Sequence, residues 1–477
     1  MRILMAASEA TPLAKTGGLA DVVHALSREL VELDNEVAIV LPYYEQIRQQ
    51  VAHHVELICS FDVRLSWRKQ TCNVYKTIID GISYYLLSNH QYFGRDHYYG
   101  YYDDAERFAF FTLAIRELIK VINFKPDIIH CHDWQVGMLP CLIREQNMYD
   151  DFYRDIKFVL TIHNPAFQGL SHPDTLGDYY SLDRYLFDEG KVRFKELLST
   201  LKAGIIYSDK ITTVSKTHAE ELYNKEKSHG LDTIMELRRN DFVGIVNGID
   251  YQEFDPTSDK YIESHFNRIT FKAGKEENKK ALYKKLHLKD NGKPLFAIVS
   301  RLTWQKGLDL VLHTVKELLN TGANFVILGT GEAMYEQEFE NIRKIYPSQM
   351  AFYNGYSDEL AHQIYAASDV FLMPSLFEPC GIGQLIALRY GTLPLVRMTG
   401  GLNDTVVPYF GNNEDIATGF GFYDYDVSAL HNTIRWALTC FENPSLIRKL
   451  RQNALAQNND WSRSANEYLD LYKSISL

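Results

Sequence analysis

The sequence predicts an α/β protein made of two domains, each built around a parallel β-sheet. Three observations support this prediction. The chain has 477 residues, which is more than one hydrophobic core usually serves. Short apolar runs alternate with amphipathic stretches along both halves of the chain. A turn signal, Asn291-Gly292-Lys293-Pro294, separates the two series.

The N-terminal half opens with a strand, a helix and a second strand. Residues 3–7 form an apolar run typical of a buried strand, and apolar residues then recur at helical spacing between Val23 and Leu33. Residues 36–41 are predicted as the second strand, which completes a βαβ unit. The further strands predicted in this half end in polar residues and lie at 127–130, 158–162, 211–214 and 244–246.

The C-terminal half repeats this alternation. Its predicted strands lie at 295–299, 325–328, 370–373 and 393–396, and its predicted helices at 308–319, 358–367 and 383–389. The final stretch, 454–475, looks helical with an interruption near Asp460-Trp461. We expect an N-terminal domain at 1–250, a linker region at 251–290, a second domain at 291–455 and a C-terminal helix at 456–477. A return of that helix to the N-terminal domain is one alternative.

The composition argues against some classes of protein. A formal net charge of −11 with no long run of Lys or Arg disfavours a nucleic-acid-binding surface. No apolar stretch has the length of a bilayer-spanning helix, and the first residues do not resemble a signal peptide. The six cysteines show no C-x-x-C spacing and suit a reduced compartment. We expect a cytoplasmic protein with no membrane or nucleic-acid partner.

Candidate ligand-binding residues follow the predicted strands, because ligands of open parallel sheets bind beyond the carboxyl ends of the strands. After the first strand, Lys15 and the pair Gly17-Gly18 combine a positive charge with a backbone that an anionic ligand can approach. An ordinary glycine turn is the alternative for this motif. Later strands of this half are followed by Asp133, His163 and Asn247.

The same rule selects residues of the second half. Arg301 and Lys306 place two cations before a predicted helix, where they can hold a diphosphate without a metal ion; a solvated surface pair is the alternative. Glu378 follows a strand and precedes a helix, so its carboxylate can either bind sugar hydroxyls or cap the helix. For Cys380, packing or a backbone contact is preferred to a reactive thiol. The other candidates are Gly355, Tyr356, Gly381, Thr399 and Gly400.

Two further clusters have simpler explanations. His130-Cys131-His132-Asp133 contains metal-ligand side chains, but successive residues of a strand face opposite sides, so the four cannot converge on one ion. We predict no metal site and no other cofactor. Tyr98 to Tyr102 either form a platform for sugar rings or pack half-buried against the protein.

In their order and spacing, these motifs resemble those of the bacterial glycogen synthases and plant starch synthases, which are retaining glycosyltransferases of the GT-B fold. The resemblance covers essentially the whole chain. Its most specific parts are Lys-Thr-Gly-Gly-Leu-Ala-Asp-Val at 15–22, Asn-Gly-Ile-Asp at 247–250, Ser-Arg-Leu-Thr-Trp-Gln-Lys-Gly at 300–307 and Phe-Glu-Pro-Cys-Gly at 377–381. It implies two Rossmann-like domains that face each other across a deep cleft.

The resemblance also implies a reaction. Glucose would pass from ADP-glucose, a substrate, to the non-reducing 4-hydroxyl of an α-1,4-glucan such as glycogen or a malto-oligosaccharide, with retention of configuration. The departing diphosphate would help to deprotonate the attacking hydroxyl on the same face. The catalytic candidates are then His163, Glu378, Lys306, Arg301 and Asp133. The donor-binding candidates are Lys15, Gly17, Gly18, Asn247, Gly355, Tyr356, Cys380, Gly381, Thr399 and Gly400.

The chain also departs from the family pattern. Family members commonly have His, Arg and Leu-Thr where this chain has Gln135, Leu376 and Ile382-Gly383. The last change removes a hydroxyl near the expected phosphate site, so a backbone amide must serve there. A UDP-glucose donor and a non-catalytic glucan-binding homologue are the alternatives. A dinucleotide-dependent oxidoreductase is disfavoured, because no G-x-G-x-x-G follows the first strand.

Overall fold

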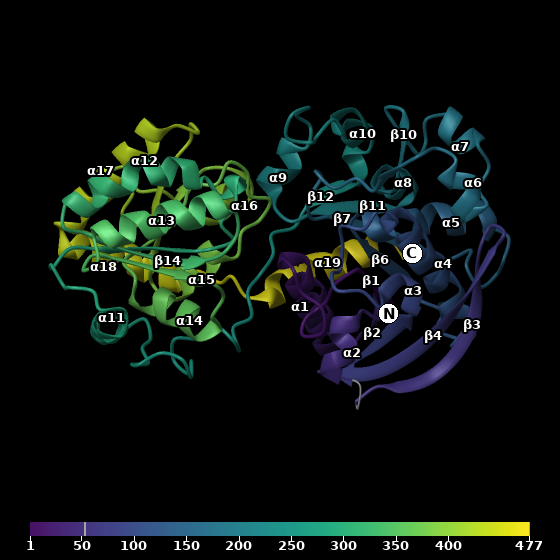
Figure 1. Ribbon diagram of the computed structural model, residues 1–477, viewed down its shortest axis with the longest axis horizontal. Coiled ribbons are helices and arrows are strands. Elements are labelled where there is room, and N and C mark those ends of the chain that lie inside the picture. The colour runs from purple at the N-terminus through teal and green to yellow at the C-terminus, as the bar shows by residue number, and fades with distance from the viewer. Residues whose placement is uncertain (52–53, 477) are drawn as a thin grey trace. The chain divides into compact units, whose positions relative to one another are not determined.

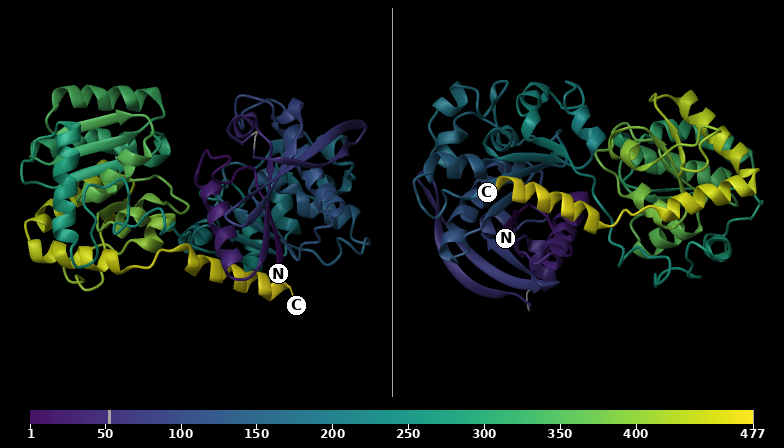
Figure 2. Two further views of the ribbon diagram at one scale, coloured as in Figure 1. Left: turned by 90° about the horizontal axis from the view of Figure 1, so that it is seen from below. Right: turned by 180° about the vertical axis from the view of Figure 1, so that it is seen from behind.

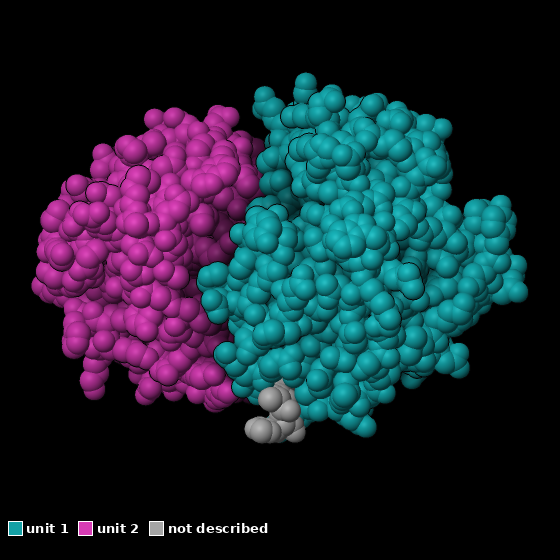
Figure 3. Space-filling view, turned by 45° about the vertical axis from the view of Figure 1, so that its right-hand side comes forward, with its two compact units in different colours: residues 1–245, 461–477 teal, residues 246–460 magenta. Residues whose placement is uncertain are grey.

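The structure is a computed structural model that describes residues 1–51 and 54–476. The chain divides into two compact units (Figure 3). Unit 1 comprises residues 1–245 and 461–477, and unit 2 comprises residues 246–460. Each unit is built around a β-sheet whose central strands are parallel, so the predicted α/β class is confirmed.

Unit 1 contains a nine-stranded sheet of order β12-β11-β7-β6-β1-β2-β5-β4-β3 (Figure 1). Its parallel strands are β1 (Arg2–Ala6), β2 (Glu36–Pro42), β5 (Ile82–Ser88), β6 (Ile128–His132), β7 (Lys157–Ile162), β11 (Lys210–Thr213) and β12 (Phe242–Gly244). Those strands include all five that we predicted after the first apolar run, with ends that differ by at most two residues. Because β1, β6 and β7 are neighbours, the residues after them lie at the same edge of the sheet.

An antiparallel hairpin that we did not predict extends this sheet. It consists of β3 (Glu56–Leu65) and β4 (Arg68–Ile79), and β4 pairs with β5. One face of the hairpin is exposed, so its residues alternate between polar and apolar and do not form the apolar runs that mark buried parallel strands. A small separate sheet joins β8 (Leu170–Ser171), β10 (Leu197–Ser199) and β9 (Arg193–Phe194).

The helices of unit 1 bury one apolar face each. The α1 helix buries Val23, Leu26 and Leu30, and it packs alongside the C-terminal helix α19 (Figure 2). The helices are α1 (Gly18–Glu32), α2 (Glu45–Val51), α3 (His90–Phe93), α4 (Asp104–Val121), α5 (Met138–Gln146), α6 (Thr175–Tyr180), α7 (Tyr185–Asp188), α8 (Thr200–Tyr207), α9 (Lys216–Glu221), α10 (Asp232–Leu237) and α19 (Trp461–Ile475).

Unit 2 contains a six-stranded parallel sheet of order β15-β14-β13-β16-β17-β18. Its strands are β13 (Leu295–Val299), β14 (Asn324–Gly329), β15 (Met350–Asn354), β16 (Val370–Met373), β17 (Leu393–Arg397) and β18 (Phe420–Phe422). Alternate residues of β13 enter different cores: Phe296 and Ile298 face one, and Leu295 and Ala297 face the other. This is the two-sided burial that a parallel sheet requires.

Helices cover both faces of the unit 2 sheet. One core contains residues of α12, α13, α17 and α18, and the other contains residues of α11, α14 and α15. The helices are α11 (Phe271–Leu286), α12 (Leu308–Asn320), α13 (Ala333–Ile345), α14 (Asp358–Ala367), α15 (Gly383–Arg389), α16 (Gly400–Thr405), α17 (Val427–Phe441) and α18 (Pro444–Ala456).

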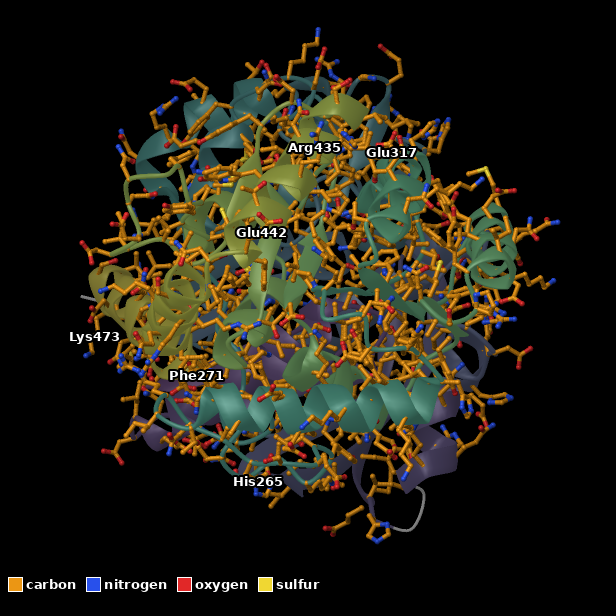
Figure 4. All side chains as sticks on the ribbon, turned by 90° about the vertical axis from the view of Figure 1, so that its left-hand side faces the viewer. His265, Phe271, Glu317, Arg435, Glu442 and Lys473 are labelled. Carbon is orange, nitrogen blue, oxygen red and sulfur yellow. The ribbon has the colours of Figure 1, made fainter. Side chains whose placement is uncertain are left out.

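Residues 251–290 do not form the linker that we expected but belong to unit 2. Phe271, at the start of α11, and Tyr283 are buried in the core beside α14 (Figure 4). Lys275 of the same helix is buried as well, and its ammonium donates to Ala366 O, Tyr390 O and Thr392 Oγ1. The charged composition of α11 conceals these anchors, which explains why the sequence suggested a linker.

The boundaries of the units also differ from the expected ones. The chain passes from unit 1 to unit 2 after Ile245, so Asn247 belongs to unit 2. Residues 456–460 likewise belong to unit 2, and α19 belongs to unit 1. Among the described residues, the helices are too short or too polar to cross a bilayer. All six cysteines are free thiols, and five of them are buried.

Candidate active site

In unit 1, Asp133 and His163 meet where two neighbouring strands end. Asp133 follows β6, His163 follows β7, and the Asp133 Oδ1 atom accepts a hydrogen bond from the His163 backbone N–H at 2.7 Å. Asp133 has a positive φ of 62°, a conformation that residues other than glycine adopt rarely. Such backbone strain is common at functional sites, and here the two hydrogen-bonded strand ends hold it in place.

The environment of Asp133 changes its acidity. Burial raises the pKa of the Asp133 carboxyl to about 7, and the negative charge of Glu9 acts in the same direction. Hydrogen bonds from the backbone amides of His163 and Asn164 oppose this change, because they stabilise the carboxylate. Asp133 therefore titrates close to neutral pH.

His163 has a histidine neighbour that the sequence did not identify as functional. The Nδ1 atom of His132 lies 3.0 Å from the Nε2 atom of His163, and both residues come from the ends of paired strands. Burial lowers the pKa of His163 to about 3 and holds the pKa of His132 well below its usual value. Both rings are uncharged at neutral pH and can exchange hydrogen bonds with neutral hydroxyl groups.

The other two residues of the His130-Cys131-His132-Asp133 motif have separate roles. The rings of His130 and His132 stack with their centroids 4.2 Å apart, as expected for alternate residues on one face of a strand. His130 bonds through Nδ1 to the Tyr472 hydroxyl at 2.7 Å, and Cys131 is buried. Among residues 1–51 and 54–476, no group of three or more His, Cys, Asp or Glu is arranged to hold a metal ion.

The loop after β1 is organised by Glu9, a second residue that our prediction missed. Its carboxylate accepts hydrogen bonds from the Thr16 hydroxyl at 2.7 Å, from the Thr16 backbone N–H and from the Tyr99 hydroxyl at 2.6 Å. Lys15 lies on the same loop and pairs with Asp21 at 2.8 Å. Glu9 follows a strand as the predicted candidates do, so the same rule could have found it.

Two residues of the tyrosine-rich segment fit the packing explanation. Tyr98 is half-buried and packs edge-on against Tyr44 with ring centroids 4.6 Å apart, and Tyr99 bonds to Glu9. Both tyrosines therefore support the protein's own structure. Tyr102 is fully exposed.

A cavity of about 280 Å³ opens in unit 1. Trp134 and Gln135, the two residues that follow Asp133, line it. Its wall combines aromatic rings with polar side chains, which is the usual character of a small-molecule site. The other lining residues are Asp104, Ala105, Phe108, Ala166, Phe167, Gln168, Gly169, Leu170, Ser171, Tyr179, Tyr180 and Thr200.

In unit 2, Lys306 and Glu378 form an ion pair. The Lys306 ammonium lies 2.7 Å from the Glu378 Oε2 atom, and the Ser375 hydroxyl donates to the same oxygen at 3.0 Å. Lys306 follows β13 and Glu378 follows β16, so the pair depends on the pairing of these two strands. Glu378 does not cap α15: the N-cap position is Ile382, and no side chain caps this helix.

Two glycines allow the loops around Glu378 to pack closely. At Gly307, with φ of 71°, a Cβ atom would lie 2.0 Å from the Pro374 carbonyl oxygen. At Gly400, with φ of 48°, it would lie 1.9 Å from the Glu378 carbonyl oxygen. Any side chain at either position would displace the loop that carries Glu378.

The remaining candidates of unit 2 differ in exposure. Arg301 is exposed, and its guanidinium makes no hydrogen bond or ion pair with any described residue. Cys380 is buried, and Gln384 donates from Nε2 to the carbonyls of Cys380 and Gly381, so the preferred packing explanation fits. Thr399 is buried at the N-cap of α16. Gly355 and Tyr356 follow the edge strand β15, and Tyr356 is 72% exposed.

Comparisons with known proteins agree with this geometry. Residues 2–237 match the starch synthase catalytic domain family, and residues 279–457 match the glycosyl transferases group 1 family. The glycogen synthase of Clostridium beijerinckii is 43% identical over 478 residues, covering 100% of this chain and 99% of that protein. The chain belongs to the glycogen synthase family. The glycogen synthase of Geobacillus thermodenitrificans is 42% identical over 476 residues, covering 100% of this chain and 98% of that protein.

Solved structures place this glycogen synthase family member in the GT-B fold. The catalytic domain of Arabidopsis thaliana starch synthase IV, solved with ADP and acarbose bound, matches with a TM-score of 0.90 and 30% identity over 100% of this chain and 99% of that one. Sucrose-phosphate synthase from Thermosynechococcus elongatus, at 16% identity and a TM-score of 0.64 over 99% of this chain and 98% of that one, shares the fold. Family membership makes the protein a hexosyltransferase that uses a nucleotide sugar and a glucan.

The departures from the glycogen synthase pattern have local explanations. Gln135 is buried and lines the unit 1 cavity. Leu376 donates its backbone N–H to Gln305 O, a contact that does not depend on its side chain. At Gly383, a Cβ atom would lie 2.8 Å from the Phe371 ring. A larger residue at this position would therefore collide with Phe371 unless that ring moved.

Proposed function

We propose that this protein transfers glucose from ADP-glucose to the non-reducing 4-hydroxyl of an α-1,4-glucan, with retention of anomeric configuration. The observation that carries the proposal is the Lys306–Glu378 pair, which places a cation and a sugar-binding carboxylate 2.7 Å apart at the carboxyl edge of a parallel sheet. A nucleotide sugar presents a diphosphate and a hexose as neighbours, and the pair offers one group to each.

The choice of ADP-glucose rests on the relatives. The starch synthase IV structure contains ADP, and it matches this chain along its whole length. UDP-glucose is the alternative donor. Gly355 and Tyr356, which we assign to the nucleoside side, follow an edge strand of unit 2 and leave the Tyr356 ring exposed.

In our mechanism, unit 2 neutralises the leaving group. Negative charge grows on the diphosphate as its bond to glucose breaks, so cations that are already in place stabilise the transition state more than the bound substrate. Arg301 has no partner among the described residues to give up, whereas Lys306 must turn from Glu378 toward the phosphate. Glu378 is then released to accept hydrogen bonds from glucose hydroxyls. We propose that these two cations supply the charge that a metal ion provides in other transferases.

Unit 1 supplies groups suited to sugars. His163 and His132 are uncharged, and Asp133 lies beside them, so together they offer donors and acceptors to hydroxyl groups without a net positive charge. Gly17 adopts an extended backbone, and no atom lies within 4 Å of where its Cβ would be. The fold does not require a glycine there, which supports a close approach of the ligand to this backbone.

The glucan acceptor is assigned to the unit 1 cavity. Its aromatic and amide side chains suit the apolar faces and hydroxyl edges of glucose units. The starch synthase IV structure contains acarbose, an oligosaccharide analogue, in addition to ADP. The same-face attack that the family resemblance implies would have the departing diphosphate receive the proton of the acceptor hydroxyl.

One assay tests these points together. The protein is incubated with glycogen and either ADP-glucose or UDP-glucose, with and without EDTA, and the released nucleotide is measured. We expect release of ADP from ADP-glucose, little release of UDP, and no loss in EDTA. An α linkage in the extended malto-oligosaccharide, read by proton NMR, indicates retention because the donor glucose is α-linked. Glucan binding without nucleotide release would establish a non-catalytic homologue instead.

A further inference from the structure

We propose that the turn of the β3–β4 hairpin in unit 1 is a distal binding site for an α-1,4-glucan chain, with Trp67 as its platform. The proposal rests on the glucan acceptor proposed above and adds a second point of contact for that chain. It assigns a role to the hairpin, which neither the sequence motifs nor the catalytic groups involve.

Trp67 is an exposed aromatic residue that is nevertheless held in place. It lies in the turn between β3 and β4, and 77% of its surface is exposed. Its indole N–H donates to Asp178 Oδ1 at 3.3 Å, and the Arg68 guanidinium lies 4.6 Å from the ring centroid. These contacts fix the ring while leaving most of it open, so a ligand that stacks there loses little side-chain entropy.

Arg68 connects this platform to the unit 1 cavity. Its guanidinium lies 5.4 Å from the centroid of the Tyr179 ring, and Tyr179 lines that cavity. An ion pair of 2.9 Å between Arg68 and Asp178 fastens the hairpin turn to α6. In Figure 1 the hairpin forms the outer edge of the unit 1 sheet, and its turn lies toward α6. Trp67, Arg68 and Tyr179 therefore form a continuous row from the surface to the cavity.

The charges around Trp67 favour a neutral ligand. Arg68 pairs with Asp178 and lies 3.6 Å from Glu106, so its positive charge is balanced by acidic neighbours. A nucleic acid or an anionic membrane would need a cluster of unpaired cations, whereas the two cations that directly follow Trp67 are both paired, Arg68 with Asp178 and Lys69 with Asp62. A glucan chain has no charge and presents apolar sugar faces, which stack on aromatic rings, together with hydroxyls.

The row of Trp67, Arg68 and Tyr179 predicts how the glucan is held. The end of the glucan lies in the cavity against Trp134, the residue that follows Asp133 in the sequence, and sugar units farther along the glucan reach Trp67. Only an acceptor long enough to span the row can use both contacts. Affinity for long glucans should therefore depend on Trp67, and affinity for short ones should not.

The test compares acceptors of different length in the full-length protein. With Trp67→Ala, we expect KM for glycogen and maltoheptaose to rise about tenfold, in line with about 1.4 kcal/mol for one aromatic stacking contact. KM for maltotriose and for ADP-glucose should stay unchanged. Trp67→Tyr should restore most of the long-chain affinity. Tyr149→Ala removes another highly exposed aromatic residue of unit 1 outside the cavity wall and serves as the matched control.

A direct binding measurement keeps this proposal separate from the proposed reaction. In native gels that contain glycogen, the wild-type protein should be retarded and Trp67→Ala should be retarded less, whether or not transfer occurs. An equal rise of KM for short and long acceptors would overturn the proposal, as would unchanged retardation in the gel. A change in sedimentation of Trp67→Ala with unchanged glycogen binding would also overturn it, because Trp67 would then contact a second copy of the chain.

Discussion

The two sheets of this protein carry opposite kinds of polar group at their carboxyl edges. In unit 1, Asp133 and His132 are buried and His163 is partly buried, and desolvation keeps both histidines uncharged at neutral pH. In unit 2, Lys306 and Glu378 form an ion pair, and the Arg301 guanidinium is exposed and has no partner among the described residues. The parallel-sheet architecture is the same, but the histidines after β6 and β7 of unit 1 are uncharged, whereas the candidates after β13 and β16 of unit 2 are charged.

This difference shows that the loops, and not the sheet, decide the chemistry of each edge. Uncharged groups with several donors and acceptors suit sugar hydroxyls, which have no charge to balance. Paired and exposed cations suit a diphosphate, whose charge increases as the glycosidic bond breaks. The predictions below test whether the edges differ in function as their electrostatics imply, beginning with the largest expected effect.

Loss of the carboxylate at the charged edge should have the largest effect. Glu378→Ala removes the group proposed to hold glucose hydroxyls, so we expect transfer to fall by about 100-fold or more, the scale for a lost preorganised polar contact. The melting temperature should fall by only a few degrees, because Lys306 keeps contact with solvent. Initial rates with ADP-glucose and glycogen, together with differential scanning calorimetry, measure both quantities.

Two further variants identify the cause of that loss. Glu378→Gln keeps the size and hydrogen-bonding capacity of the side chain but removes its charge. Loss of transfer without loss of stability in this variant would show that the charge is needed for function and not for folding. Glu340→Ala breaks an ion pair of the same 2.7 Å length between Glu340 and Arg343 on α13 and should leave transfer unchanged. Near-normal transfer by Glu378→Ala, or loss of activity that merely follows unfolding, would contradict the assignment.

Removal of the cation at the same edge should have the next largest effect. Lys306→Ala is expected to lower kcat by about 10- to 100-fold, since a hydrogen bond to a charged group is worth about 1.5–3 kcal/mol. KM for ADP-glucose should rise less, because the charge on the leaving group is greatest in the transition state. Lys316→Ala, an exposed lysine of α12, is the control. A rise in KM with unchanged kcat would limit Lys306 to substrate binding.

Most of the fold was predictable from the sequence because parallel strands are apolar on both faces. The runs at 295–299 and 370–373 were assigned with the observed bounds. The β3–β4 hairpin was not predicted, because residues of β3 such as Val63 and Leu65 alternate with polar ones and do not form the unbroken apolar run of a buried parallel strand. The buried residues of α11 were hidden within its charged composition.

The positions of the site residues were also predictable, but their partners were not. The rule that ligands bind after strand ends selected Lys306 and Glu378 correctly as residues of one sheet edge. Their ion pair joins residues 72 positions apart and exists only because β13 pairs with β16. The contact between His132 and His163 likewise depends on the pairing of β6 with β7, which the sequence alone does not specify.

A pH measurement tests the uncharged edge. The pKa of Asp133 is raised from 3.8 to about 7 by burial, so the folded state prefers the protonated form. Wild-type stability should be unaffected by this group below pH 3.8, should fall as the pH rises toward 7, and should then level off. Asp133→Asn cannot ionise, so its melting temperature relative to wild type should increase by a few degrees between pH 5 and pH 8. A difference that does not change with pH would contradict a buried, protonated Asp133.

The smallest effect is expected where unit 1 anchors its C-terminal helix. Tyr472 of α19 bonds through its hydroxyl to His130 Nδ1 at 2.7 Å. His130 lies two residues before His132 on β6, and the two rings stack. Tyr472→Phe leaves this buried nitrogen without its partner, at a cost of about 1–3 kcal/mol in the free energy of unfolding. The His130 ring itself stays in place beneath His132, so kcat and KM should not change.

Tyr346→Phe, which removes an exposed hydrogen bond to Asn320, should cost less and is the control. Denaturant titration gives the free energies, and rates with ADP-glucose and glycogen give the kinetics. A fall in kcat of Tyr472→Phe with stability near the wild-type value would contradict this expectation. It would mean that α19 influences the proposed catalytic groups through His130, so that His130 would belong to the functional site together with Asp133, His132 and His163.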